Sequence, residues 1–359
     1  MNTDQENLAD TDDPNPGEGA STRGTPADAA RLSAAMDGFR LSQCIAAVAR
    51  LGLADAIQDT PKTSSELAAD VGADADALHR FMRALASEGL FASAKKDGWV
   101  HTPMSRLLRR ADPSAFAHRA MALGSLAWGP WGELQHSIET GQPAFDQVHK
   151  QPFFAYLQAN PALAEGFGKA MTSFTRATAE AVVAAYDLSR ARHIVDIGGG
   201  HGVLLDVVLC AHPTVHATLV DRPEVIAQGA PQLREGAASR CTLVAADFFE
   251  DPLPAADTYV LSWIVHDWGD EECIRLLRRC ASAMSPDSEL LIVEMIIEPG
   301  DAPSPAKMFD LEMLVQTGGR ERTAAEYAAL LGAGGLTLSR RVDTQAPHSV
   351  LVATRGVGV

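Results

Sequence analysis

Three side chains with different chemistry stand together at the end of an apolar stretch: His266, Asp267 and Trp268. A histidine has an unperturbed pKa of about 6.5, so it is mostly neutral near pH 7 and can take a proton from a reacting hydroxyl group. Taken alone, a histidine at the end of a strand is more often structural than catalytic. Whether His266 is catalytic or structural therefore has to be judged from the neighbouring motifs.

A cluster of glycines, which reads VDIGGGHG over residues 195–202, is the second feature. Its spacing is G-x-G-x-G, whereas a dinucleotide-binding turn needs G-x-G-x-x-G so that the third glycine packs a helix beside the pyrophosphate. Gly198 and Gly200 let the backbone approach a ligand closely. The spacing argues against a nicotinamide dehydrogenase, although glycine-rich turns between a strand and a helix also occur for structural reasons.

Acidic residues stand at two further strand ends. Asp221 can accept hydrogen bonds from both hydroxyl groups of a ribose, or it can cap the helix that follows Pro223. Asp247 can accept from an adenine amino group while Phe248 covers the ring, or the two can be a turn residue and a core residue. In open parallel sheets, ligands sit beyond the carboxyl ends of the strands. Together with the glycines, these positions predict a nucleoside site without a phosphate cradle.

The elements that must hold these residues alternate along the C-terminal half of the chain. Near-continuous apolar runs, each typical of a buried parallel strand, alternate with helical segments. The expected strands are residues 193–200, 216–223, 241–249, 258–268 and 288–297. Two more, residues 336–343 and 348–355, follow each other with no helix between them and predict an antiparallel hairpin. The pattern predicts an α/β fold with a Rossmann-like, doubly wound sheet and a C-terminal antiparallel hairpin.

Residues 29–112 have a different pattern: three helical segments and then two short extended pieces around Asp97 and Gly98, which is the order of a winged helix. A winged helix often binds DNA, but its recognition helix should be basic, and the segment 74–89 is not. A packing and dimerisation module is the better interpretation. The apolar helix that starts near Arg31 has more hydrophobic surface than a small domain covers, which suits a homodimer.

The remaining segments complete the expected organisation. Residues 1–28 are acidic and rich in Pro, Gly, Ser and Thr, as in a disordered tail, and they lack the basic and apolar regions of a signal peptide. Residues 113–188 are expected to form a helical linker whose large apolar side chains line a substrate pocket. Residues 189–359 are expected to form the nucleoside-binding domain.

Charge and cysteine content narrow the classes of function. The net charge of −16 disfavours non-specific binding to nucleic acid or to an anionic membrane surface. The five cysteines form no C-x-x-C pair, which argues against a disulfide framework and a zinc site and fits a reducing cytoplasm. No apolar run approaches the length of a membrane span. We therefore expect a cytoplasmic protein that takes a small-molecule ligand and needs no metal, membrane or nucleic acid.

Six motifs together make the chain similar to the S-adenosylmethionine-dependent O-methyltransferases of small molecules, typified by the caffeate, acetylserotonin and bacterial polyketide and mitomycin enzymes. The motifs are VDIGGGHG, DRPEV, DFFED, WIVHDWGDEE, LLIVEMIIEPG and GGRERTAAEYAALL, and the resemblance extends from about Leu32 to Arg355. It implies a winged-helix dimerisation domain and S-adenosylmethionine as the cofactor of residues 189–359. It also implies a metal-independent reaction on a hydroxyl group, expected to be phenolic, of an aromatic secondary metabolite.

The same resemblance implies roles for individual residues. His266 matches the catalytic base, and Glu294 and Glu321 match the carboxylates that flank it. The expected cofactor contacts, with Ser262 standing where plant members commonly have lysine, are Gly198, Gly200, Asp221, Asp247, Phe248, Ser262 and Trp268. Residues expected to contact the acceptor, from the resemblance or as apolar pocket residues, are Trp128, Phe167, Met171, Thr175, Asp267 and Met313. The helix with Phe167, Met171 and Thr175 is expected to touch the cofactor as well, and Asp267 can instead hold the loop.

Other functions remain open at this point. Some bacterial relatives of the same fold use the cofactor for hydroxylation or decarboxylation, but they lack a histidine at the position of His266. The acceptor atom can also be nitrogen or sulfur, because nothing in the apolar pocket residues selects oxygen. A DNA-binding regulator that senses the cofactor is a third possibility, which the acidic charge opposes.

Overall fold

Residues 24–95 and 98–356 are described by the computed structural model of the chain. The chain divides into two units between Cys44 and Ile45, and this boundary lies within helix α1 (Pro26–Leu51). This helix begins before the expected start at residue 29, because Thr25 Oγ1 accepts the amide of Asp28 at 3.2 Å and caps it. The disordered tail predicted for residues 1–28 lies almost entirely outside the described residues.

The second unit contains the predicted winged-helix arrangement. Its strands form an antiparallel sheet in the order β1-β3-β2. The elements are α2 (Leu53–Ala56), β1 (Lys62–Thr63), α3 (Ser64–Val71), α4 (Ala75–Ser87), β2 (Phe91–Ala94), β3 (Gly98–His101) and α5 (Pro103–Leu107). A capping box of Thr63 and Glu66 starts α3, and the carboxylate of Asp74 accepts the amide of Ala77 at 2.8 Å to start α4. Short polar caps thus determine where both helices begin.

A helical region connects the winged helix to the sheet domain. It comprises α6 (Phe116–Ala122), the π-helical turn η1 (Leu123–Ala127), α7 (Trp128–Gly132), α8 (Leu134–Thr140), α9 (Ala144–His149), α10 (Phe153–Ala159) and α11 (Pro161–Ala185). Phe145, Phe153 and Leu157 form a buried core between α9 and α10. Within the described ranges, no helix combines the length and apolar character needed to cross a membrane.

Among the described residues, the sheet domain has seven strands in the order β6-β5-β4-β7-β8-β10-β9. They are β4 (His193–Ile197), β5 (His216–Asp221), β6 (Cys241–Ala245), β7 (Thr258–Ser262), β8 (Glu289–Met295), β9 (Leu336–Asp343) and β10 (His348–Arg355). The strands β4 to β8 pair in parallel, whereas β10 runs antiparallel to both β8 and β9. The predicted doubly wound sheet with a C-terminal antiparallel hairpin is confirmed.

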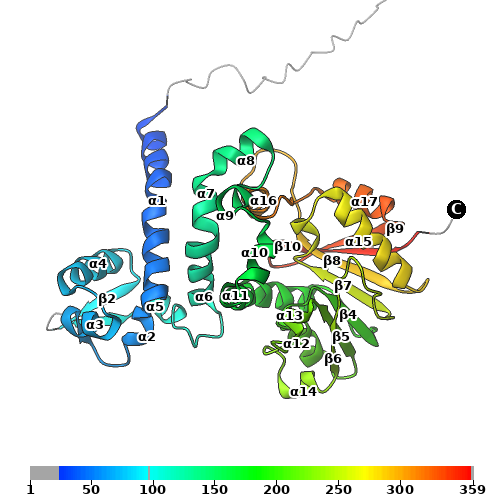
Figure 1. Cartoon of the computed structure of the whole chain (residues 1–359), viewed down its shortest axis with the longest axis horizontal. Helices are drawn as coiled ribbons and strands as arrows, with labels where there is room; N and C mark the ends of the chain where they lie inside the picture. Colours follow the sequence, from blue (N-terminus) through cyan, green and yellow to red (C-terminus); the bar gives the residue numbers. More distant parts are fainter. Residues whose placement is uncertain (1–23, 96–97, 357–359) are drawn as a thin grey trace, which may run out of the picture. The chain divides into compact units, whose positions relative to one another are not determined.

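Helices cover both faces of this sheet (Figure 1). Side chains alternate between the faces along a strand, so Ile194 and Val195 of β4 belong to different cores. Helices α11 and α12 (Val203–Ala211) pack in the core that contains Ile194. Helices α15 (Asp270–Ala283) and α17 (Ala324–Ala333) pack in the core that contains Val195. Since β4, β5 and β7 are parallel neighbours, the residues that follow them meet at one edge.

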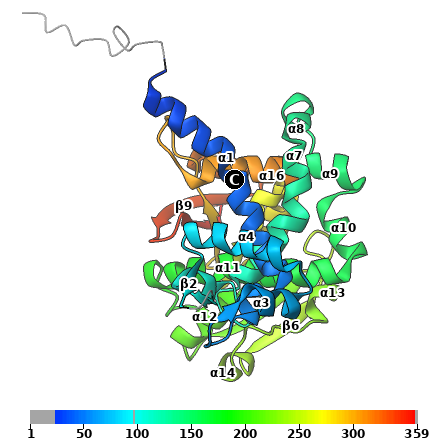
Figure 2. The ribbon, with the colours of Figure 1, turned by 90° about the vertical axis from the view of Figure 1, so that its left-hand side faces the viewer.

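Helix α16 (Pro305–Gln316) joins this edge to the helical region. It packs against α7, α8 and α9, which lie far earlier in the chain (Figures 1 and 2). One bond across the contact runs from the indole N–H of Trp131 to the carboxylate of Glu312. On its other side, Ala306 of α16 packs with Trp263 and Met295. The short helices α13 (Pro223–Ile226) and α14 (Glu235–Ala238) lie by β5 and β6.

Candidate active site

Strand β7 stops before the histidine that the sequence pattern placed at its end. The strand ends at Ser262, and His266 lies in a single 3₁₀ turn, η2 (Val265–Asp267). The expectation of a strand through residue 268 is wrong because Trp263 has a φ of 60°, in the left-handed region, and turns the chain out of the sheet. A bulky residue in this conformation is strained, and such strain persists where the surroundings enforce it.

One oxygen of Glu294 holds the start of this turn. Its Oε1 accepts hydrogen bonds from the amides of Ile264 at 3.1 Å and Val265 at 2.8 Å, and a weaker one from His266 at 3.4 Å. Glu294 is fully buried on β8, the neighbour of β7 in the sheet. The carboxylate therefore provides partners for amides that have left the sheet ladder.

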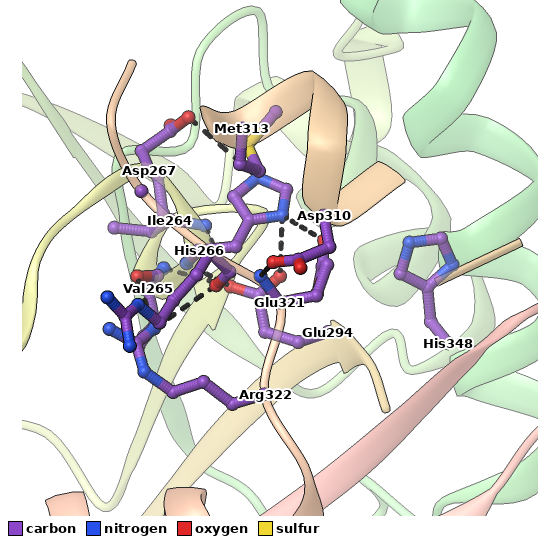
Figure 3. A network of polar contacts seen from close by, with 12 residues as sticks. Ile264, Val265, His266, Asp267, Glu294, Asp310, Met313, Glu321, Arg322 and His348 are labelled. Atoms are coloured by element: carbon purple, nitrogen blue, oxygen red, sulfur yellow. Dashed lines mark hydrogen bonds and ion pairs between the residues drawn. The ribbon is translucent and has the colours of Figure 1, made fainter. Parts of the chain in front are cut away.

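Carboxylates hold one side of the His266 imidazole (Figure 3). Its Nδ1 lies 2.8 Å from Oε1 of Glu321 and 3.2 Å from Oε2 of Glu294, and all three side chains are buried. Nδ1 carries the proton that Oε1 of Glu321 accepts, with Oε2 of Glu294 as a close charged neighbour, so Nε2 is the basic nitrogen of the neutral ring. The closest approach of Asp267 to Nε2 is 4.0 Å, from its Oδ1.

These charges change the acidity of the imidazole. Burial lowers the pKa of His266, but the Glu294 and Glu321 carboxylates outweigh burial and raise that pKa to about 10. Burial also raises the pKa of Glu294 to about 7 and that of Asp267 to about 6. The two carboxylates therefore favour the imidazolium form of His266 more than the unperturbed pKa of histidine would suggest.

Aromatic rings enclose the imidazole. The ring of Phe309 in α16 stacks on it with 5.7 Å between centroids, and the ring of Trp263 meets it edge-on at 5.6 Å. Met313, one turn after Phe309, is buried and lies beside the ring (Figure 3). Met313 was expected at the site and Phe309 was not. The i, i+4 spacing that places both on one helix face was the signal that could have indicated Phe309.

The loop at residues 318–322 places Glu321 beside the turn that contains His266. The amide of Glu321 donates to Oδ1 of Asp310 at 2.9 Å, and the amide of Arg320 donates to the carbonyl of His266 at 2.8 Å. Gly319 passes so close that a Cβ there would lie 1.9 Å from the carbonyl oxygen of His266. Glycine at this position therefore allows the loop to contact the turn.

The glycine-rich turn after β4 is bonded to the end of β5. Asp221 accepts the amide of Gly200 at 2.8 Å through Oδ2, and the amide of Arg222 at 2.7 Å through Oδ1. Gly198 has a φ of 75°, and a Cβ there would lie 2.4 Å from the side chain of Ile264. The glycine turn therefore lies directly against the residues that lead into the His266 turn.

Trp268 packs among phenylalanines at the same edge. It stacks on Phe154 of α10 with 5.5 Å between centroids, and it meets Phe248 and Phe249 edge-on. Asp247 is exposed beside this group, and its carboxylate accepts the amide of Phe249 at 2.8 Å. Phe154 comes from the segment whose large apolar side chains were expected to line a pocket, but its place beside Trp268 depends on tertiary packing.

Known proteins resemble the chain along most of its length. Residues 131–337 match the O-methyltransferase domain, and residues 33–110 match the O-methyltransferase dimerisation domain. The chain belongs to the O-methyltransferase family. The phenazine O-methyltransferase of Lysobacter antibioticus is 37% identical, with 88% of this chain and 93% of that protein covered. The mitomycin biosynthesis 6-O-methyltransferase of Streptomyces lavendulae is 36% identical, with 92% and 97% covered.

Some relatives of this O-methyltransferase are named for transfer to nitrogen. The phenazine-1-carboxylate N-methyltransferase of Pseudomonas aeruginosa is 31% identical, with 88% of this chain and 93% of that protein covered. Human N-acetylserotonin methyltransferase, solved in complex with S-adenosylmethionine, has a TM-score of 0.85 at 27% identity, with 94% and 100% covered. The cofactor of the enzyme is S-adenosylmethionine.

Three features of the enzyme fit this cofactor. Gly198 has no Cβ, which would collide with Ile264, so the backbone of the glycine turn stays bare beside Ile264 and Phe248. Both carboxylate oxygens of Asp221 keep a lone pair beyond their backbone bonds, which suits the two hydroxyls of a ribose. The hydroxyl of Ser262 is buried and has no hydrogen-bond partner within the described residues. Buried hydroxyls without a partner are rare, and a ligand that completes them is one physical explanation.

The residues expected to contact the acceptor come from three helices and the turn. Half-buried positions at helical spacing along α11 are Phe167, Met171 and Thr175. Met171 packs against Trp263, the residue whose ring meets the imidazole. Trp128, at the start of α7, is 42% exposed, whereas Met313 is buried. Met313 therefore lies beside His266, Met171 packs against the cluster that contains Trp263, and Trp128 lies at the surface.

The three residues at the centre of the site also have the composition of a metal site. His266, Glu294 and Glu321 each offer a ligand atom, and these atoms lie within 4.8 Å of one another. An ion such as zinc would need the Nδ1 lone pair at about 2.1 Å. The separation of 2.8 Å from Nδ1 to Glu321 is that of a hydrogen bond from an N–H group, and Glu294 lies 3.2 Å from Nδ1 as an ion pair. In this structure Nδ1 of His266 therefore acts as a hydrogen-bond donor to Glu321.

Proposed function

We propose that the enzyme methylates a hydroxyl group of an aromatic secondary metabolite, with His266 as the general base. One observation supports this proposal most directly: Nδ1 is hydrogen bonded to the buried carboxylate of Glu321 and paired with that of Glu294, so Nε2 is the nitrogen that remains for the acceptor. Trp263 and Phe309 supply the apolar, aromatic surroundings that suit a flat acceptor. Relatives named for phenazine chemistry support the same class of acceptor.

The proposed reaction moves one proton and one methyl group. As the acceptor oxygen attacks in line with the methyl group, its O–H bond breaks and the proton moves to Nε2 of His266. Glu294 and Glu321 stabilise the resulting imidazolium, as the acidic member of a catalytic triad does. When bound, the cofactor supplies a methyl group on a positively charged sulfur. Because the pKa of His266 is raised to about 10, close to that of a phenol, this proton transfer is nearly balanced.

For the cofactor, we propose contacts at the ends of neighbouring parallel strands. The backbone at Gly198 and Gly200 approaches it closely, and the carboxylate of Asp221 accepts hydrogen bonds from its ribose. Asp247 accepts from the adenine amino group, Ser262 offers its hydroxyl, and aromatic rings cover the base. The residues that supply these rings are Phe248 and Trp268, which already contact each other edge-on.

We also infer that the enzyme works as a homodimer. Residues 33–110 match the dimerisation domain of the family. Large apolar side chains of α1 are exposed, with Leu32 at 64% and Met36 at 68%. An exposed apolar face of this kind usually marks an interface, and a second copy of the chain would cover it.

The acceptor class can be tested with a panel of aromatic compounds. We expect methyl transfer to phenols, detected by mass as the replacement of one hydrogen by methyl. We expect none to the matched compounds whose hydroxyl is already methylated, because they offer no O–H proton to Nε2 of His266. Paired compounds with an amino group in place of the hydroxyl measure the preference for oxygen. Products that lose carbon dioxide or gain oxygen instead of methyl would contradict the proposal.

Catalysis without a metal is part of the proposal. We expect exhaustive treatment with a strong chelator to leave kcat unchanged, because Nδ1 of His266 is bonded to carboxylates rather than free for an ion. Added zinc or magnesium should not raise kcat above its starting value. Metal content measured on the treated protein serves as the control for complete removal. Activity that falls on chelation and returns with one added metal would refute this part.

A further inference from the structure

The residue after Glu321 is an arginine whose side chain is almost wholly buried. Arg322 is 2% exposed, and its guanidinium donates two hydrogen bonds to Oδ1 of Asp270, at 2.7 and 3.2 Å. It also donates to the carbonyl of Val265 at 3.3 Å and to that of Trp268 at 3.0 Å. Bonds from a charged donor are stronger than neutral ones, and the planar fork of arginine fixes several partners at once.

The two carbonyls belong to the turn that carries the proposed base. Val265 precedes His266 and Trp268 follows it, so the guanidinium bonds the turn on both sides of the histidine. At the start of the same turn, Glu294 accepts backbone amides. The turn thus has an anion at its amide end and a cation at its carbonyl end, which matches the direction of its peptide dipoles. Figure 3 shows Arg322 on the opposite side of His266 from Met313.

We propose that Arg322 is a positioning residue that holds this turn so that Nε2 of His266 points toward the acceptor. The inference rests on the proposed role of His266 as base. Arg322 acts through the backbone carbonyls of the turn and through Asp270. Its loss should therefore lower the rate of the chemical step more than it weakens binding of the acceptor. Misplacement of a reacting group by about 1 Å can cost about 100-fold in rate.

A small pocket beside the guanidinium makes a specific test possible. Its volume is about 250 Å³, and its lining includes Arg322, Asp270, Ile274 and Leu330. A free guanidinium ion has the same planar set of donors as the arginine head group. It can enter the space that Arg322→Ala leaves and restore the bonds to the two carbonyls. Rescue by guanidinium is therefore a signature of positioning that a general loss of stability does not produce.

The experiment measures kcat, acceptor KM and melting temperature for Arg322→Ala, with and without guanidinium far below the concentrations that unfold proteins. We expect kcat to fall by about 100-fold, KM to change little, and guanidinium to restore part of kcat. Arg322→Lys keeps the charge but not the planar fork, so it should stay impaired. The matched control is Arg278→Ala, which removes an exposed arginine of α15 that donates to the carbonyl of Ala333. It should keep the wild-type kcat and show no response to guanidinium.

Two outcomes for Arg322→Ala would overturn the inference: an unchanged kcat, or a folded variant whose lost kcat guanidinium does not restore. If that variant does not fold, Asp270→Ala replaces it, because the Asp270 side chain is 59% exposed and orients the guanidinium. A lower kcat at an unchanged melting temperature then supports positioning, and an unchanged kcat opposes it. His266→Ala separates the two proposals. Wild-type turnover in that variant refutes the base assignment, whatever the result at Arg322.

Discussion

Replacement of His266 by alanine is expected to abolish methyl transfer while leaving the affinity for the cofactor nearly intact. Without the imidazole, the acceptor hydroxyl must lose its proton to water, and general base catalysis contributes a factor of about 10²–10⁴. The buried carboxylates of Glu294 and Glu321 also lose their cationic partner, so the site repels a developing phenolate. We therefore expect a loss at the upper end of that range, measured as kcat at saturating cofactor.

Two controls make this result specific to the base. Calorimetric titration with S-adenosylmethionine should give similar affinities for the variant and the wild type, because the proposed ribose contact lies at the end of β5. His216→Ala is the matched substitution, since His216 is an exposed histidine at the first residue of β5, away from the carboxyl edge of the sheet. It should retain full activity. Equal activity of His266→Ala and the wild type would exclude the histidine as the base.

Glu321→Gln should produce the second large effect, and it should appear in the pH profile. The carboxylates raise the pKa of His266 to about 10, so the neutral base becomes more abundant as the pH rises from neutrality. The value of kcat/KM should accordingly increase with pH through the alkaline range. Glutamine keeps an acceptor for Nδ1 but removes the charge, so the pKa of His266 falls. The rising part of the profile should therefore move to a pH lower by about 1 or more.

The height of this profile should change as well. In the proposed reaction Glu321 stabilises the imidazolium that forms, so we expect the maximal rate of Glu321→Gln to fall about 10-fold or more. Glu294→Gln is the comparison, because Glu294 also accepts the amides of Ile264 and Val265. Both the melting temperature and the maximal rate of that variant should be lower than those of the wild type. A Glu321→Gln profile that has the wild-type shape at a lower height would argue against the electrostatic role.

Much of the fold could be predicted from patterns along the chain. Continuous apolar runs alternating with helices predicted the parallel sheet, and the two consecutive runs at the C-terminal end predicted the hairpin of β9 and β10. Residues at strand ends indicated the position of the site, since parallel strands bring their carboxyl ends to one edge of the sheet. Asp221 and Gly200, from different strand ends, are hydrogen bonded to each other as this reasoning requires.

The geometry around the base could not be predicted in this way. No local pattern indicates a left-handed Trp263, because that conformation is unfavourable for a bulky residue and depends on Glu294, which arrives from the next strand. Phe309 and Phe154 come from helices that tertiary packing brings to the site. The pKa of His266 depends on distances to carboxylates that sequence spacing does not determine.

Helix α16 has a consequence for the redesign of this enzyme. It carries Phe309, which stacks on the imidazole, and Asp310, which accepts the amide of Glu321. In the proposed site, the residues of α16 therefore affect both the choice of acceptor and the reaction rate. A substitution that reshapes the pocket at Met313 also disturbs Phe309 and Asp310, which align the base. Directed evolution toward new acceptors should diversify α11, at positions such as Phe167, before α16. A library of α16 variants should contain a larger fraction of inactive enzymes than a library of α11 variants.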